Sequence, residues 1–364
     1  MKTIHLVCAA RPNFMKIAPL YHALRKEAWA NPVIAHTGQH YDLNMSDNFF
    51  TDLRLPEPHI HLGVGSGSHA EQTGHVMINY EKILVQGNPD LVVVVGDVNS
   101  TMAATIAAVK LGIKVAHLEA GLRSFDRTMP EEINRLVTDS LCDLLWTPSE
   151  DADNNLISEG IARERIHCVG NIMIDSLEMI RDTIENEEAY KAFDQSPNSY
   201  GVVTLHRPSN VDSPDNLKSI CNMLKDIAGK TPLIFPIHPR TRKNLEDWGM
   251  LDFLEKTENI NIPDPLSYIP FLNLVFNCKF VITDSGGIQE ETTYLNIPCF
   301  TLRANTERPI TITQGTNHLC DLKNIRQILK DVLASQSLKR EPIKLWDGKT
   351  AARVINSIKL FVNV

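Results

Sequence analysis

The chain has 364 residues, of which 43% are hydrophobic and 22% charged, and its formal net charge at pH 7 is -8. This length predicts about two domains, and the acidic balance argues against nucleic acid as a general partner, because binding a phosphate backbone requires a basic surface. No apolar run approaches the roughly 20 residues of a membrane span, and no signal-peptide pattern opens the chain, so we expect a cytoplasmic protein with no membrane partner.

The cysteines and histidines carry no metal-binding pattern. The seven cysteines are scattered, mostly within apolar segments, and no Cys-x-x-Cys pair occurs. His36 and His40 have a spacing that could suit a metal, but no third ligand lies nearby in the sequence. We therefore expect buried structural thiols and no metal.

Short Val/Ile/Leu-rich runs alternate with amphipathic stretches of helical length in the first half of the chain. This alternation is typical of a parallel sheet covered by helices on both faces. It predicts an α/β fold with a Rossmann-like domain over residues 1–170. The strands expected in this domain are 3–9, 33–37, 91–96, 114–119, 144–147 and 166–169.

The loop after the first strand, residues 10–16, lacks the Gly-x-Gly-x-x-Gly pattern that lets a backbone approach a dinucleotide pyrophosphate. We therefore expect no nicotinamide or flavin and no other cofactor. Arg11 in this loop can still meet a phosphate from the other domain. Lys16 either does the same or lies exposed on its helix.

Carboxylates follow two neighbouring strands of this domain. Asp97 ends one strand, and Ser100 or Thr101 can cap the helix that follows. Glu119 ends the next strand. Glu131 comes third, in a helical turn led by proline, where one of two consecutive acids can serve only to complement the helix dipole. Three acids converging on one crevice favour acid–base chemistry, because neighbouring carboxylates push their pKa values apart.

The second half repeats the alternation and predicts a second Rossmann-like domain over residues 171–347. Two such domains imply a cleft between them. Apolar positions between residues 351 and 361 predict a helix within 348–364 that crosses back to pack on the first domain. The strands expected in the second half are 201–205, 233–236, 260–262, 280–283, 298–302 and 318–320.

A glycine-rich turn follows the strand 280–283. Ser285, Gly286 and Gly287 open a helix there, and a helix N-terminus with glycines lets backbone N–H groups reach phosphate oxygens. Glu291 lies one turn inside the helix, where it can reach a ribose. Arg308 supplies a cation about 20 residues on, so the turn predicts a phosphate site.

Two more strands of this half end in histidine and arginine. His206 and Arg207 follow the strand 201–205, and His238 follows the strand 233–236. The carboxyl edge of an open parallel sheet is where such folds bind ligands. We therefore expect an anionic ligand at this edge.

Six segments together resemble the non-hydrolysing UDP-N-acetylglucosamine 2-epimerases, in that family's order and over nearly the whole chain. The resemblance implies two Rossmann-like domains in a glycosyltransferase-B-like fold, a UDP-sugar substrate, a homodimer in the cytoplasm, and supply of UDP-N-acetylmannosamine for surface polysaccharides. The segments are Arg-Pro at 11–12 with Lys16, and residues 96–101, 117–124, 130–135, 284–291 and 306–309.

The resemblance also implies a mechanism. The family expels UDP by elimination across C1 and C2 of the sugar, forming a glycal, and then adds UDP back with a proton delivered to the other face. Which carboxylate acts on which face stays open. Carried onto this sequence, the resemblance implies that the catalytic residues are Asp97, Glu119 and Glu131, with His206 at the leaving phosphate. It implies that Glu291 holds the ribose and that Lys16 supports the phosphate or sugar. The residues implied to hold the diphosphate are Arg11, Ser285, Gly286, Gly287 and Arg308.

The sequence departs from the family in places that leave alternatives open. Some members are activated by a second UDP-N-acetylglucosamine, and of the positions implied for such an allosteric site Gln39, Arg207 and His238 remain. The loop 36–47 is closer to relatives that epimerise UDP-diacetamido uronic acids. Two further alternatives are a hydrolysing epimerase that releases N-acetylmannosamine and a glycosyltransferase of similar fold, which would not need three carboxylates.

Overall fold

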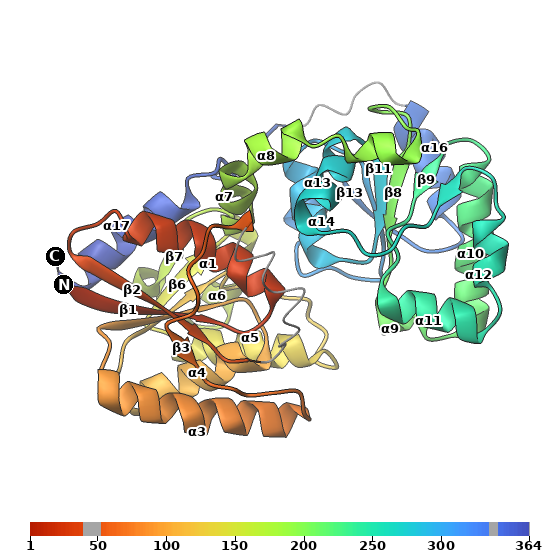
Figure 1. Cartoon of the computed structure of the whole chain (residues 1–364). Helices are drawn as coiled ribbons and strands as arrows, with labels where there is room; N and C mark the ends of the chain where they lie inside the picture. Colours follow the sequence, from red (N-terminus) through yellow and green to blue (C-terminus); the bar gives the residue numbers. More distant parts are fainter. Residues whose placement is uncertain (39–51, 335–340, 364) are drawn as a thin grey trace. The chain divides into compact units, whose positions relative to one another are not determined.

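The computed structural model describes residues 1–38, 52–334 and 341–363, which form two compact units (Figure 1). Unit 1 comprises Met1–Ile180 and Lys344–Val364, and unit 2 comprises Arg181–Ile343. Each unit is a parallel sheet covered by helices on both faces. The two Rossmann-like domains expected from the sequence are confirmed.

Unit 1 contains a seven-stranded sheet in the order β3-β2-β1-β4-β5-β6-β7, and all of its pairings are parallel. The six strands expected from the sequence are present. A seventh, β3, has only two residues and extends the sheet beyond β2. The strands are β1 Lys2–Cys8, β2 Ala30–His36, β3 Ile60–His61, β4 Leu91–Val95, β5 Val115–Leu118, β6 Leu144–Thr147 and β7 Ile166–Cys168.

Helices cover both faces of this sheet: α1, α7 and α17 lie on one face, and α3, α4 and α5 on the other (Figure 1). Strand β4 consists of leucine and four valines, all buried, as expected for a central parallel strand. The helices are α1 Arg11–Leu24, α3 His69–Gly87, α4 Asn99–Lys110, α5 Pro130–Leu141, α6 Glu150–Ser158, η1 Arg163–Arg165, α7 Ile172–Met179 and α17 Thr350–Phe361.

Unit 2 contains a six-stranded parallel sheet in the order β10-β9-β8-β11-β12-β13. The six strands expected in the second half are all present. They are β8 Gly201–Thr204, β9 Leu233–Ile234, β10 Ile260–Asn261, β11 Phe280–Thr283, β12 Cys299–Leu302 and β13 Asn317–Cys320.

The core of unit 2 has an apolar cluster on each face of this sheet. One lies under α10, α11, α12 and α16, and the other under α13 and α14. Phe280 and Phe300 meet edge to face at 6.0 Å and join neighbouring strands. The helices are α8 Arg181–Asn186, η2 Ala189–Phe193, α9 Pro208–Val211, α10 Pro214–Ala228, α11 Pro239–Asp247, α12 Leu251–Glu255, α13 Tyr268–Asn277, α14 Gly286–Tyr294, α15 Ile310–Thr313 and α16 Ile325–Ala334.

The unit boundaries differ from the expected 170 and 347. Helix α7 packs on α1 and α17, so the first crossing between units falls at Ile180. The indole of Trp346 donates to the carbonyl of Pro148 at 3.0 Å, which fixes the returning chain to unit 1 just after the second crossing. Asp175 of α7 accepts hydrogen bonds from the backbone N–H groups of Thr350 and Ala351, at 3.0 and 2.8 Å, and so caps α17.

One expected helix cap is wrong. Helix α4 begins at Asn99 after Val98, so Ser100 and Thr101 lie inside the helix and not at its N-cap, and the Val98 side chain makes no capping hydrogen bond. The Thr101 hydroxyl donates instead to the carbonyl of Val95 at 2.9 Å, and the Ser100 hydroxyl meets that of Thr37 at 2.9 Å. These hydroxyls join the helix start to the strand ends of the sheet.

The cysteines are free, and six of the seven are buried. Within residues 1–38, 52–334 and 341–363, no helix is long and apolar enough to cross a membrane.

Candidate active site

Strands β4 and β5 end beside each other in unit 1, with Val95 paired to Leu118. Gly96 follows β4 with φ 68°, and Glu119 follows β5 with φ 72°. A side chain in this left-handed region costs of order 1 kcal/mol and persists only where the surroundings impose it, often at functional sites. The turn therefore holds the Glu119 side chain at the carboxyl edge of the sheet.

Lys16 of α1 forms a buried ion pair with the Glu119 carboxylate. Glu119 is only 4% exposed, and its Oε1 has no hydrogen-bond partner among the described residues. A Cβ at Gly96 would lie 3.1 Å from the Lys16 amine and 3.4 Å from the Asn13 amide nitrogen, so a side chain there would displace Lys16, and the φ of 68° also favours glycine. The exposed position that the sequence allowed for Lys16 is wrong.

Asp97 pairs with Arg135 of α5 at 2.5 Å, and its side chain remains 30% exposed. Arg135 also pairs with Glu132 at 2.8 Å. Glu132 is buried and accepts hydrogen bonds from the backbone N–H groups of Ser124 and Phe125 at 2.9 and 3.0 Å. Glu132 therefore has the structural role that the sequence allowed for one of the two acids.

Glu131 precedes it in the first turn of α5 and is half-buried. None of the described residues forms an ion pair or hydrogen bond with its carboxylate. The Asn134 amide donates to the carbonyl of Asp97 at 2.8 Å, which holds the start of α5 against the turn after β4. Asp97, Glu119 and Glu131 thus come from three neighbouring elements of unit 1.

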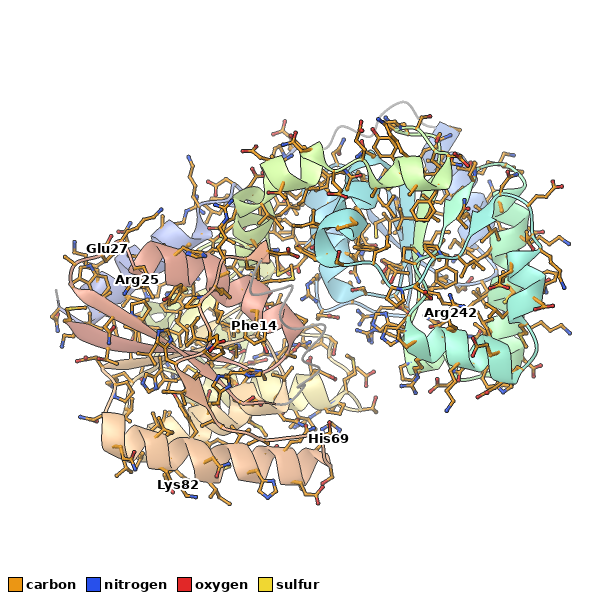
Figure 2. The ribbon with its side chains drawn as sticks, viewed as in Figure 1. Phe14, Arg25, Glu27, His69, Lys82 and Arg242 are labelled. Atoms are coloured by element: carbon orange, nitrogen blue, oxygen red, sulfur yellow. The ribbon has the colours of Figure 1, made fainter. Side chains whose placement is uncertain are left out.

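The start of α1 is fixed by its own contacts. The Asn13 amide oxygen accepts from the backbone N–H of Ala10 at 3.0 Å, and its nitrogen donates to Val95 at 3.2 Å. Phe14, labelled in Figure 2, packs on His36 with ring centroids 5.1 Å apart. Arg11 is the first residue of α1, and its side chain lies outside the described part of the structure.

Asp284 organises the carboxyl edge of unit 2. It is fully buried and accepts from the backbone N–H groups of His206 and Arg207 and from the Asn210 amide, at 3.0, 2.9 and 3.0 Å. Burial raises its pKa, but the His206 ring and these donors outweigh burial, so the pKa lies below the usual range. His206 Nδ1 lies 3.0 Å from Asp284, which orients the ring and directs Nε2 away from this carboxylate.

The glycine-rich turn opens α14 as the sequence predicts, with Ser285 before the helix. A Cβ at Gly286 would lie 2.7 Å from Arg308 and 2.8 Å from Glu307, whereas a Cβ at Gly287 would meet nothing within 4 Å. Arg308 is buried and pairs with Glu290 at 2.9 Å and with Glu307 at 2.5 Å. The open side of the helix end is therefore at Gly287.

Glu291 is buried on α14, and the Tyr268 hydroxyl donates to its Oε1 at 2.9 Å. Burial and the neighbouring Glu290 raise the pKa of Glu291 to about 8. Its Oε2 has no partner among the described residues. A buried oxygen of this kind can accept a hydrogen bond from a ligand hydroxyl.

The residues expected for an allosteric site fall in different places. His238 is exposed, with its ring 5.4 Å from that of His206. Burial of part of the ring and the neighbouring His206 lower the pKa of His238. Arg207 is half-buried beside Asp284, and Gln39 lies outside the described residues.

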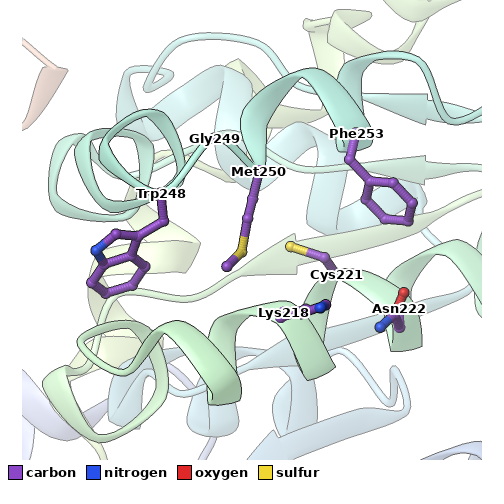
Figure 3. A pocket seen from close by; sticks show the side chains of 7 residues that line it. All are labelled: Lys218, Cys221, Asn222, Trp248, Gly249, Met250 and Phe253. Atoms are coloured by element: carbon purple, nitrogen blue, oxygen red, sulfur yellow. The ribbon is translucent and has the colours of Figure 1, made fainter.

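A pocket of about 320 Å³ lies between α10 and the α11–α12 connection, where Trp248, Met250 and Phe253 face Cys221 (Figure 3). None of the expected site residues lines it. A second pocket, of about 560 Å³, lies at the ends of β12 and β13 and includes Asn210, which also bonds Asp284.

Three residues of the site were missed from the sequence. Arg135 was detectable, because an arginine three residues after Glu132 on a helix predicts an ion pair with it. Asn13 and Tyr268 gave no signal, because their partners lie on other elements.

The fold and the site define a class: a two-domain α/β protein of glycosyltransferase-B-like fold, with acids at one sheet edge and a glycine-led helix end at another. The family model described as UDP-N-acetylglucosamine 2-epimerase matches residues 22–359. The chain belongs to this family.

Named relatives agree. The UDP-N-acetylglucosamine 2-epimerase of Methanocaldococcus jannaschii is 42% identical over 360 residues, covering 97% of each chain. The crystal structure of the UDP-GlcNAc 2-epimerase from that organism, in complex with UDP-GlcNAc and UDP, is 40% identical, covers 99% of this chain and 100% of its own, and has a TM-score of 0.89. The UDP-2,3-diacetamido-2,3-dideoxy-D-glucuronate 2-epimerase of Pseudomonas aeruginosa is 38% identical over 88% of each chain.

Proposed function

We propose that this protein interconverts UDP-N-acetylglucosamine and UDP-N-acetylmannosamine by inverting C2 of the sugar without net hydrolysis. Family membership, the M. jannaschii relative and the crystal structure from that organism with UDP-GlcNAc and UDP support this substrate. The observation that carries the chemistry is the buried Lys16–Glu119 ion pair, because it presents a carboxylate with one unfilled oxygen at a strained strand end.

Elimination and re-addition account for the inversion. A base takes the C2 proton, a C1–C2 double bond forms, and the C1–O bond breaks with its electron pair leaving on UDP. In the return step UDP oxygen bonds C1 again, and an acid delivers a proton to the opposite face of C2. We assign the base and the acid to Asp97, Glu119 and Glu131, since proton transfer on two faces requires at least two groups.

Cations beside two of these carboxylates support the assignment. Lys16 and Arg135 form ion pairs with Glu119 and Asp97 and so hold both carboxylates in place at the sheet edge.

UDP must stay bound between elimination and re-addition, which requires contacts other than those of the catalytic carboxylates. The N-terminus of α14, at Ser285, Gly286 and Gly287, offers backbone N–H groups to the diphosphate, and Arg308 adds a buried cation beside it. His206, oriented by Asp284, donates to the leaving phosphate oxygen. Glu291 accepts from the ribose hydroxyls, and Arg11 contributes to the diphosphate contacts.

A modified sugar is the second candidate substrate. The relative from Pseudomonas aeruginosa acts, by its name, on a UDP-diacetamido glucuronate and matches 88% of this chain. The carboxylate chemistry at C2 would be the same, and the difference would lie at C3 and C6 of the sugar.

We further propose that the protein is a cytoplasmic homodimer that supplies a precursor of surface polysaccharides.

The test is incubation of the purified protein with UDP-N-acetylglucosamine in deuterated water, without added cofactor, followed by proton NMR at C2. Deuterium at C2 of both UDP-sugar epimers is the expected result. Release of free N-acetylmannosamine would assign the hydrolysing reaction. Silence with this substrate, together with epimerisation of the diacetamido glucuronate, would assign the second substrate.

A further inference from the structure

A buried charged network lies behind the turns that carry Asp97 and Glu119. His117 sits within β5 and is fully buried. Its Nε2 lies 2.8 Å from the carbonyl oxygen of Gly96, and its Nδ1 lies 2.6 Å from Asp139 Oδ1. A carbonyl oxygen only accepts, so Nε2 carries a proton.

Asp139 binds the turn that carries Glu119. Its Oδ2 accepts from the backbone N–H of Gly121 at 3.0 Å and lies 2.8 Å from the Arg123 guanidinium. Burial raises the pKa of Asp139, but the His117 ring and Arg123 outweigh burial and bring it below the usual value. Through Nδ1 and Nε2 the ring of His117 therefore connects Asp139 to the Gly96 carbonyl.

The network continues to the surface. Arg123 binds Glu159 through two hydrogen bonds of 2.7 Å each. Burying charges is tolerated when they are paired and hydrogen-bonded, as the buried Asp139 and Arg123 are. Gly121, at φ 80°, has no room for a Cβ, which would lie 2.4 Å from the Ala152 carbonyl oxygen.

The contacts join exactly two backbone segments of the site. The Gly96 carbonyl precedes Asp97, and the Gly121 N–H follows Glu119 by two residues. Gly96, Glu119 and Gly121 all have left-handed φ, which glycine adopts freely but which persists at Glu119 only where other contacts impose it. His117 and Asp139 span the two turns and supply such contacts.

We propose that His117 and Asp139 form a clamp that sets the relative positions of Asp97 and Glu119 for proton transfer at C2. They are positioning residues, since neither contacts the catalytic carboxylates directly in the hydrogen bonds above. The inference rests on the proposed function, and it adds residues that act on the chemical step rather than on UDP binding.

Isosteric variants separate this role from simple stability. Asp139→Asn should lower kcat by about 10²-fold, the cost of a misplacement near 1 Å, with the KM of UDP-N-acetylglucosamine and the Kd of UDP within about threefold. The matched control is Asp153→Asn, because Asp153 is another buried carboxylate of unit 1, bonded to Thr147 at the end of β6. Its kcat should stay within about threefold of wild type.

Two variants of His117 distinguish its contact with Gly96 from its contact with Asp139. His117→Gln retains a donor near the Nε2 position, whereas His117→Asn retains one near Nδ1. We expect Gln to restore more of kcat than Asn, because the contact with Gly96 holds the turn of Asp97. If Asp139→Asn does not fold, Glu159→Gln tests the outer end of the network, where the side chain is 30% exposed, and should give a smaller loss of kcat.

A readout without turnover is the ¹⁵N NMR spectrum of histidine-labelled protein at neutral pH, assigned with His117→Gln. A protonated Nε2 on His117 is expected, and an unprotonated Nε2 would overturn the clamp, because the Gly96 carbonyl can only accept. Equal kcat losses in the Asp139 and Asp153 variants, or a loss confined to UDP affinity, would also overturn it. A wild type that does not epimerise this UDP-sugar would overturn the proposed function alone, because the NMR result does not depend on it.

Discussion

At the scale of single residues, the site depends on carboxylates whose surroundings differ. Asp97 is half-buried beside one guanidinium, Glu119 is buried beside one amine, and Glu131 is half-buried without a partner among the described residues. The proposed epimerisation needs one group that takes a proton and another that gives one, and these carboxylates offer three different surroundings for the two roles.

Asp97→Asn tests the first of these roles. The amide retains the size of the side chain but cannot exchange a proton, so kcat should fall by about 10²- to 10⁴-fold. The Kd for UDP, measured by calorimetry, should change by less than about threefold, since the diphosphate is assigned to unit 2. Asp90→Asn is the control, because Asp90 precedes the same strand and pairs with Lys2 at the surface. Retained turnover in Asp97→Asn would remove Asp97 from the catalytic set.

Glu291 predicts a pH dependence of stability. Its pKa of about 8 in the folded protein exceeds its ordinary value of 4.5. A raised pKa means that the stability from this group is complete below pH 4.5 and is lost as pH rises through 8, at up to about 1.4 kcal/mol per pH unit. Glu291→Gln should therefore unfold in urea with a weaker pH dependence over this range.

The measurement can follow unit 2 by itself. Trp248 is the one tryptophan between residues 181 and 343, so its fluorescence reports this unit once the other three tryptophans are replaced by phenylalanine. Equal slopes of unfolding free energy against pH for wild type and Glu291→Gln would show that Glu291 is ionised in the folded protein at neutral pH.

At the scale of elements, the N-terminus of α14 has two adjacent glycines in different surroundings: Gly286 lies close to other side chains, whereas Gly287 has open space beside it. Gly287→Ala adds a methyl group with no atom of the described residues within 4 Å, apart from its chain neighbours and the backbone of α14, and alanine favours a helix over glycine by up to about 1 kcal/mol. We expect an unchanged or higher Tm and a Kd for UDP raised about tenfold or more, equivalent to 1.4 kcal/mol. Wild-type UDP affinity in Gly287→Ala would place the diphosphate elsewhere.

Gly286→Ala provides the contrast. Its methyl group would lie 2.7 Å from Arg308 and 2.8 Å from Glu307, so both Tm and UDP affinity should fall. The two adjacent glycines thus separate the effect on the ligand from the effect on the fold.

Elements were also the level at which sequence reasoning worked best. Twelve strands were predicted because buried parallel strands are continuous apolar runs. Strand β3 was missed because it has two residues and exists only through its pairing with β2. The carboxylates were found from their positions after strands, but the pairing of Glu119 with Lys16 was not, since it depends on packing between distant parts of the chain.

At the scale of the whole molecule, the chain crosses between units twice, so unit 1 is discontinuous in sequence. Its last helix, α17, contributes Val354, Ile355 and Ile358 to the buried core and packs on α1, the helix that carries Lys16. The C-terminal segment therefore supports the site from the face of the sheet opposite α3, α4 and α5 (Figure 1).

The capping contact of Asp175 tests this dependence. Asp175→Ala removes the acceptor for the N–H groups of Thr350 and Ala351, and the loss of a cap costs about 0.5–2 kcal/mol. Hydrogen exchange should accelerate in α17 and along α1, while the exchange of α13 and α14 in unit 2 stays unchanged. Asp175→Asn retains an acceptor oxygen, so its exchange rates in α17 should lie between those of the wild type and those of Asp175→Ala. Equal acceleration of exchange in both units would mean that they open together. Unit 1 would then not be an independent folding unit, and the boundary at Ile180 would not separate two regions of different stability.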